Sequence, residues 1–140
     1  TTDELQHVIN STGIGLIFVH ADLLENLLSV RDLIPKLSNI VVFGGCFSDY
    51  DSLCSFEEFI DGAPATEPKA EIDETDAFSI TYTGGTTGFP KGVVVNHASR
   101  IIGSVRAERE FNMVAGDINC CSTPLFHIAG HRWRSFADQG

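Results

Sequence analysis

Basic side chains are scarce in this sequence: nine Lys and Arg face nineteen Asp and Glu, for a formal net charge of −10. A field of that sign repels the phosphates of nucleic acids and the anionic surfaces of membranes. We therefore expect no nucleic-acid partner. A ligand that carries phosphate must be held by positive groups gathered in one place, or must arrive with a divalent cation.

Paired cysteines and long apolar runs are also lacking. The four cysteines are Cys46, Cys54, Cys120 and Cys121. None forms a C-x-x-C pair, which favours reduced, partly buried thiols in a cytoplasmic protein over a disulfide framework. The longest apolar run, 14–19, is far shorter than a transmembrane helix, and no targeting pattern is visible. The chain starts at Thr1 and its only methionine is Met113, so we expect the natural start to be missing.

The order of apolar segments predicts an α/β fold. Residues 16–19 and 40–43 are compact apolar runs, which indicates strands that are buried on both faces. Between them, residues 22–35 carry leucines at near-helical spacing up to a proline. A strand, a helix and a strand in this order predict a βαβ unit with parallel strands and a right-handed crossover.

Capping and linker patterns mark the neighbouring elements. Thr1 and Glu4 have the spacing of a capping box, which predicts a helix to about residue 10. Residues 52–60 indicate a short helix. Residues 61–76 are rich in Pro, Ala and acidic side chains, so we expect an exposed linker there.

The second half alternates strands and a helix around a Gly/Thr-rich loop. β-Branched residues and alternation indicate the strands, and an Asn that can cap the helix marks its start. In order, we expect a strand at 78–82, a loop at 83–90, a strand at 93–95, a helix from Asn96 to about Asn112, a turn at 116–117 and a strand at 118–122.

The stretch from Tyr82 to Gly92, YTGGTTGFPKG, carries the strongest chemical signal. Its glycines let the backbone approach a polyphosphate closely and direct successive N–H groups at it. Thr83, Thr86 and Thr87 add hydroxyl donors, and its lysine adds a compact positive charge. With a strand on each side, this loop is suited to holding a triphosphate.

Two other phosphate-binding motifs are excluded. The Walker pattern G-x-x-x-x-G-K-[ST] needs Gly before Lys and a hydroxyl after it, but Pro90 precedes Lys91 and Gly92 follows it. This order argues against a Walker-type NTPase. A dinucleotide fingerprint that began at Gly13 would need its third glycine where Phe18 stands, and it would precede its strand.

The loop resembles the phosphate-binding signature of the adenylate-forming superfamily, Y-T-[SG]-G-T-T-G-x-P-K-G. This superfamily includes acyl-CoA synthetases, coumarate-CoA ligases, luciferases and peptide-synthetase adenylation domains. Every position from Tyr82 to Gly92 matches, with Gly84 in a slot that admits Ser or Gly.

Flanking segments agree with this resemblance. Residues 94–97 are similar to the family's strand and His-containing helix start, although we expect His97 to have a structural role. Residues 124–130, PLFHIAG, look like the aromatic-His motif that lines the acyl pocket. The residues at 8–10 and 35–41 resemble those of fatty acyl-CoA synthetases in particular.

The resemblance implies an acid–thiol ligase, with residues 1–130 forming part of its large N-terminal α/β domain. Such an enzyme activates a carboxylic acid, here a fatty or aryl acid, with ATP as acyl-AMP, and then transfers the acyl group to coenzyme A. Mg²⁺ and loop donors would stabilise the departing pyrophosphate. The implied catalytic residues are Lys91, Thr86 and His127, the last shaping the acyl site. The implied nucleotide-binding residues are Thr83, Gly84, Gly85, Thr86, Thr87, Gly88 and Lys91.

Later motifs of the family are expected outside these 140 residues. They supply an adenine-stacking aromatic, an acid for Mg²⁺, a ribose-binding Asp and a catalytic Lys. We therefore expect the chain alone to be inactive. Residues 131–140 depart from the family's apolar helix, which suggests a splice, frameshift or cloning boundary.

Two alternatives stay open at this point. The chain could be a truncated, non-catalytic paralogue that still binds nucleotide. A zinc site on Cys120, Cys121, His127 and His131 is disfavoured because the cysteines are adjacent, so no metal ligand is expected. Acyl chain length, oligomeric state and the organelle that holds the full-length protein are not constrained by the sequence.

Overall fold

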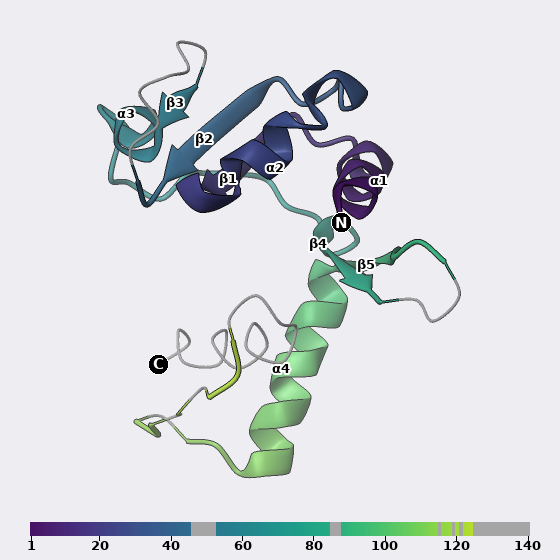
Figure 1. Cartoon of the computed structure of the whole chain (residues 1–140). Coiled ribbons are helices and arrows are strands. Elements are labelled where there is room, and N and C mark those ends of the chain that lie inside the picture. Colours follow the sequence, from purple (N-terminus) through teal and green to yellow (C-terminus); the bar gives the residue numbers. More distant parts are fainter. Residues whose placement is uncertain (46–52, 85–87, 115, 119, 121, 125–140) are drawn as a thin grey trace. The chain divides into compact units, whose positions relative to one another are not determined.

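The computed structural model describes residues 1–45, 53–84, 88–114, 116–118, 120 and 122–124. The chain forms two compact units, residues 1–69 with 82–92, and residues 70–81 with 93–140. Its elements, labelled in Figure 1, are α1 Thr2–Thr12, β1 Leu16–His20, the 3₁₀ turn η1 Ala21–Leu23, α2 Leu24–Leu28, the 3₁₀ turn η2 Arg31–Leu33, β2 Asn39–Phe43, β3 Cys54–Ser55, α3 Phe56–Ile60, β4 Ala77–Thr83, β5 Lys91–Asn96 and α4 His97–Phe111.

The first unit is built on a parallel sheet in the order β1-β2-β3. Ile17 lies opposite Ile40, and Val41 opposite Cys54. The chain passes from β1 through η1, α2 and η2 before it reaches β2, so β1 and β2 form the expected parallel βαβ unit. The predicted α/β fold class is confirmed.

The core lies where α1 and α2 cover one face of this sheet. Its buried residues are Ile9, Val19, Leu24, Leu27, Val30, Ile34, Leu37, Ile40 and Val42. α1 is fixed at its start by the predicted capping box, in which the Thr1 hydroxyl accepts from the Glu4 N–H and the Glu4 carboxylate accepts from the Thr1 backbone. The helix runs two residues further than predicted, to Thr12.

The expectation that β1 is buried on both faces is wrong. Val19 is 8% exposed, but on the opposite face Leu16 is 37% and Phe18 47% exposed. On that face, the rings of Phe56 and Phe59 on α3 meet the Phe18 ring edge-on at centroid distances of 6.2 and 5.4 Å.

The single helix predicted for residues 22–35 is divided into η1, α2 and η2. The Asp22 N–H donates to His20 Nδ1, which starts the first turn as 3₁₀. Farther along, Val30, Ile34 and Leu37 are all buried. Pro35 has no backbone N–H to continue a helix, and the chain returns to β2 in short turns.

Residues 53–76 correct one boundary and confirm the linker. Residues 54–55 form β3 instead of helix, and α3 starts behind a second capping box between Ser55 and Glu58. Residues 61–76 contain no helix or strand and are exposed throughout.

The second unit centres on β4, β5 and α4, and β4 and β5 pair in a two-stranded sheet. The Asn96 side chain caps α4 by accepting from the Ser99 N–H at 2.9 Å, as predicted. His97 has the structural place expected of it: its ring meets the edge of Phe78, with centroids 5.2 Å apart.

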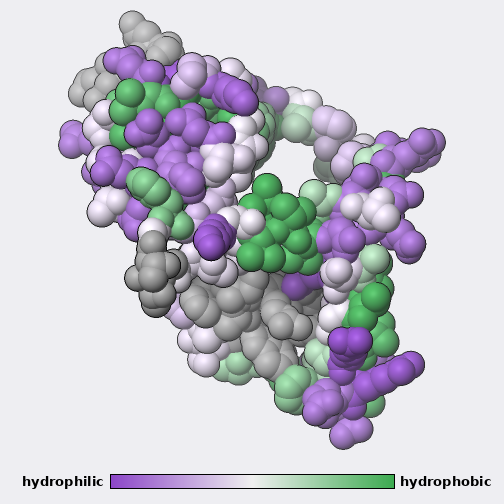
Figure 2. Space-filling view, turned by 90° about the vertical axis from the view of Figure 1, so that its right-hand side faces the viewer, coloured by the Kyte–Doolittle hydropathy of each residue, from purple (hydrophilic) through white to green (hydrophobic). Residues whose placement is uncertain are grey.

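Apolar side chains in the described part of this unit stay accessible. Val94 is 61%, Ile101 57% and Phe111 58% exposed, and apolar surface is visible in green in Figure 2. The predicted strand at 118–122 is wrong as far as the structure describes it, because residues 118, 120 and 122 lie in neither sheet. A strand needs a neighbour for its backbone hydrogen bonds, and neither described sheet extends to them.

Within the described segments, no helix has the length and hydropathy needed to cross a bilayer. Cys54 and Cys120 are free thiols. Cys54 is half-buried as expected, whereas Cys120 is exposed. Cys46 and Cys121 lie outside the described residues.

Candidate functional site

The Gly/Thr-rich loop leaves the sheet at the end of β4 and returns at the start of β5. At its neck, the Thr83 hydroxyl donates to the backbone carbonyl of Lys91 at 3.4 Å. Thr83, Gly84, Gly88 and Lys91 are exposed. Lys91 is the only charged residue between positions 82 and 92, so the described ends of the loop present one cation and one hydroxyl to solvent.

The two described glycines of the loop differ in backbone conformation. Gly88 has φ 156°, a conformation that L-residues with side chains rarely adopt. At Gly84 the backbone has no such requirement, and a Cβ placed there would meet no atom within 4 Å. The chain's own packing therefore leaves open space above Gly84.

Several predicted site residues lie outside the described residues. These are Gly85, Thr86, Thr87 and His127. The structure brings Thr83 and Lys91 together at the neck of the loop. Gly84 and Gly88 are the described residues that precede and follow positions 85–87. Residues 131–140 also lie outside the described part.

The strand before the loop is attached to helix α1. The Tyr82 hydroxyl lies 2.5 Å from Ser11 Oγ and 3.4 Å from the Val8 carbonyl oxygen. Ser11 Oγ itself donates to that carbonyl at 3.2 Å, which leaves the Tyr82 hydroxyl free to donate to Ser11. Sequence reasoning had selected neither Ser11 nor Val8.

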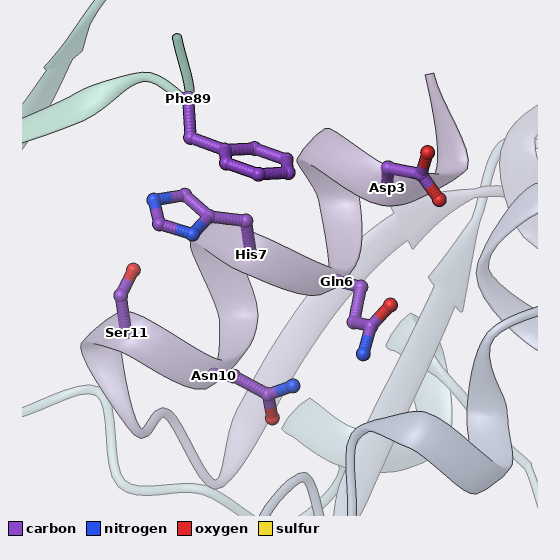
Figure 3. A pocket seen from close by; sticks show the side chains of 6 residues that line it. All are labelled: Asp3, Gln6, His7, Asn10, Ser11 and Phe89. Carbon is purple, nitrogen blue, oxygen red and sulfur yellow. The ribbon is translucent and has the colours of Figure 1, made fainter.

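The end of the loop is attached to the same helix. The imidazole of His7 stacks on the Phe89 ring, with centroids 4.8 Å apart and planes 21° from parallel. His7 Nε2 lies 3.0 Å from the Pro90 carbonyl oxygen, to which it can donate. Figure 3 shows the two rings face to face, with Ser11 farther along α1.

A surface hollow of about 510 Å³ opens beside this contact. It is lined by Asp3, Gln6, His7, Asn10, Ser11 and Phe89. The His7 contact spans 83 residues of sequence, and an ordinary His in an amphipathic helix gives no signal of it. No pattern in the sequence could have paired these residues.

Metal ligands are not gathered in the described part of the chain. No three His, Cys, Asp or Glu side chains there are placed to hold an ion. Cys121, His127 and His131, three of the four residues of the disfavoured zinc site, lie outside the described residues.

Comparison with known proteins assigns the family. The AMP-binding enzyme family matches residues 1–137. Long chain acyl-CoA synthetase 7, peroxisomal, of Arabidopsis thaliana is 31% identical over 135 residues, which cover 90% of this chain and 19% of that protein. 4-Coumarate–CoA ligase 3 of the same plant is 31% identical over 139 residues, covering 91% and 23%.

The solved structures agree with the sequence match. A long-chain-fatty-acid–CoA ligase from Archaeoglobus fulgidus superposes with a TM-score of 0.76 at 26% identity, over 95% of this chain and 25% of that one. The chain thus spans 19% and 23% of the length of the two plant relatives. Its parallel sheet, its loop signature and these matches agree: the chain belongs to the AMP-binding enzyme family.

Proposed function

We propose that this chain supplies the ATP-phosphate loop of a carboxylic acid–CoA ligase. In the first step a carboxylate oxygen attacks the α-phosphorus of ATP, the bond to the β-phosphate oxygen breaks, and acyl-AMP and pyrophosphate form. In the second step the thiol of coenzyme A attacks the acyl carbon, AMP leaves, and the thiol proton passes to solvent or a base.

The loop signature carries this proposal, because every position from Tyr82 to Gly92 matches it. The open space above Gly84 agrees with it, since it leaves the main chain accessible to a ligand that approaches closely. Thr83 and Lys91 stand at the neck of the same loop. A hydroxyl, a backbone surface and an ammonium group at one place suit the β- and γ-phosphates of a nucleotide.

Lys91 and the loop donors would act mainly on the leaving group. Negative charge accumulates on pyrophosphate as its bond to the α-phosphate breaks, and fixed donors aimed at those oxygens lower the barrier. We assign this role to Thr83, Gly84, Gly85, Thr86, Thr87, Gly88 and Lys91. His127 would shape the acyl site.

Mg²⁺ fits this scheme as a companion of the nucleotide. The described residues offer no carboxylate cluster to hold it, and Mg²⁺ prefers phosphate and water oxygens when protein ligands are few. When bound, it would neutralise phosphate charge and so make the nucleotide compatible with a chain of net charge −10.

The acid substrate is proposed as a fatty or aryl acid. One relative is named for long-chain acyl groups and another for 4-coumarate, and they match this chain at equal identity. A panel of palmitate, octanoate and 4-coumarate would separate the two classes.

The test is acid-dependent exchange of labelled pyrophosphate into ATP, followed by detection of the CoA thioester. It should use the longest natural polypeptide that contains these residues. Exchange that needs both acid and Mg²⁺ is expected. Nucleotide binding without exchange for any acid would favour the non-catalytic paralogue instead, and absence of both would refute the proposal.

A variant at Gly84 links the assay to the observation. Gly84→Val should cut exchange by about 100-fold, because loss of one preorganised donor surface typically has that effect. Its melting temperature should stay unchanged, since no atom of the chain lies within 4 Å of the new Cβ. Normal exchange in Gly84→Val would contradict close approach of the nucleotide to the main chain at Gly84.

A further inference from the structure

Both ends of the loop are fastened to one helix, and we propose that α1 positions the phosphate loop for catalysis. Ser11 holds Tyr82, the residue before the loop, and His7 holds Phe89 and Pro90, the last residues of the loop. The inference rests on the proposed function, because it names what orients the same site.

The spacing of the two attachments suits this role. His7 and Ser11 are four residues apart, so they lie on one face of α1, about 6 Å apart along its axis. Tyr82 and Pro90 are consequently held at separate points of one rigid element. The distance across the neck of the loop is then set by the helix as well as by the pairing of β4 with β5 and the bond from the Thr83 hydroxyl to the Lys91 carbonyl.

Helix α1 is fixed well enough to serve as a reference. Its start is closed by the capping box, and Ile9 is buried in the core at 2% exposure. The Asn10 side chain also donates to the Leu33 carbonyl at 2.8 Å. The loop lacks support from burial, since none of its described residues is buried.

His7 and Ser11 are therefore positioning residues and not catalytic ones. They contact Tyr82, Phe89 and Pro90, and those residues flank the phosphate-binding backbone. Loosening the flanks should misplace loop donors relative to the β- and γ-phosphates. Small displacements of positioning groups reduce rates strongly, whereas binding of the acid should be affected little.

The experiment compares four variants of the longest natural polypeptide with wild type. His7→Leu/Ser11→Ala removes both attachments, and His7→Gln/Ser11→Ala restores a donor near His7 Nε2. Asn10→Ala removes a bond of α1 that does not involve the loop, and Gln6→Ala changes the same hollow without a known loop contact. Three quantities are measured: the kinetics of acid-dependent pyrophosphate exchange, the melting temperature, and the hydrogen–deuterium exchange of peptide 82–92 without ligand.

We expect the first double variant to lose about 10-fold in kcat/KM for MgATP, with KM for the acid changed less than about 2-fold. Peptide 82–92 should exchange faster in that variant. The His7→Gln/Ser11→Ala variant should regain much of the lost kcat/KM and much of the lost protection of peptide 82–92. Asn10→Ala should lower the melting temperature without changing KM for MgATP, and Gln6→Ala should change neither.

Two failures can be told apart. If wild type shows no acid-dependent exchange, the proposed function fails, while the deuterium exchange of peptide 82–92 still decides whether α1 holds the loop. If wild type is active but the double variant behaves like Asn10→Ala in kinetics and in peptide exchange, the positioning role is overturned.

Discussion

Residues 2–43 and residues 77–111 contain similar elements, yet only the first region buries a core. In the first, Leu27 is 1% and Val42 0% exposed. In the second, no described residue of β4, β5 or α4 is buried, and Val94 is 61% exposed. Helices and strands therefore form in both regions, but among the described residues only the first region has a buried core.

The second region relies on directed contacts instead. Asn96 caps α4 with its side chain, and the His97 N–H donates to the Asp76 carbonyl at 3.1 Å. Such contacts contribute about 1 kcal/mol each, much less than a buried core. Substitutions in the first region should thus change stability, and substitutions at the loop should change chemistry.

The largest effect is expected in the core. Leu27→Ala should lower the free energy of unfolding by about 3 kcal/mol, because it removes buried methyl groups and leaves a cavity. Its matched control is Leu23→Ala, one helical turn earlier and 56% exposed, which should cost less than about 0.5 kcal/mol. Denaturant unfolding followed by circular dichroism measures both. Equal losses would show that the first region is not held by this core.

Lys91→Ala should reduce activity without reducing stability. Loss of the only charged side chain between positions 82 and 92 should slow acid-dependent pyrophosphate exchange by about 100-fold, because charge on the departing pyrophosphate is left uncompensated. Lys91 is exposed, so the melting temperature should not change. The adenylation rate should fall more than the affinity for the acid. A parallel fall in both, together with a lower melting temperature, would indicate misfolding.

Asn96→Ala tests whether caps support the second region. It leaves the Ser99 N–H without its partner and should cost about 1 kcal/mol. Amide exchange along α4 should accelerate while the amides of α1 and α2 stay protected. Uniform acceleration in both regions would contradict their independent stabilisation.

The smallest effect concerns pH. The Glu58 carboxylate accepts hydrogen bonds from the Ser55 backbone N–H and the Ser55 hydroxyl. These bonds, the backbone one above all, hold the pKa of Glu58 below the ordinary value of 4.5. The stabilisation is therefore present above pH 4.5 and is lost as the pH falls through the lower folded pKa. Glu58→Gln should melt below wild type at neutral pH, and the difference in melting temperature should shrink as the pH falls below 4.5. A difference in melting temperature that widens in acid would contradict the lowered pKa of Glu58.

Local patterns predicted most of the fold. The capping box of Thr1 and Glu4, the paired apolar runs at β1 and β2 and the Asn96 cap depend on neighbours within a few residues, so the sequence displays them. The strand Cys54–Ser55 was missed because two residues carry no periodicity. The exposure of Phe18 was missed because an apolar run does not reveal what covers it.

The candidate site was predictable only in part. The loop signature identified the stretch from Tyr82 to Gly92, because phosphate binding constrains consecutive residues. The attachment to His7 and Ser11 joins positions 83 and 71 residues apart. Contacts of that length depend on the folded path of the chain, and a single sequence contains no record of them.

The most direct test of the central claim is hydrogen–deuterium exchange with and without MgATP, in the longest natural polypeptide that contains these residues. Nucleotide held by the loop should slow exchange in peptide 82–92, while peptides from 14–43 stay unchanged. Lys91→Ala should abolish most of that protection. Protection confined to other segments, or none at all at saturating MgATP, would contradict the assignment of this loop to the phosphates of ATP.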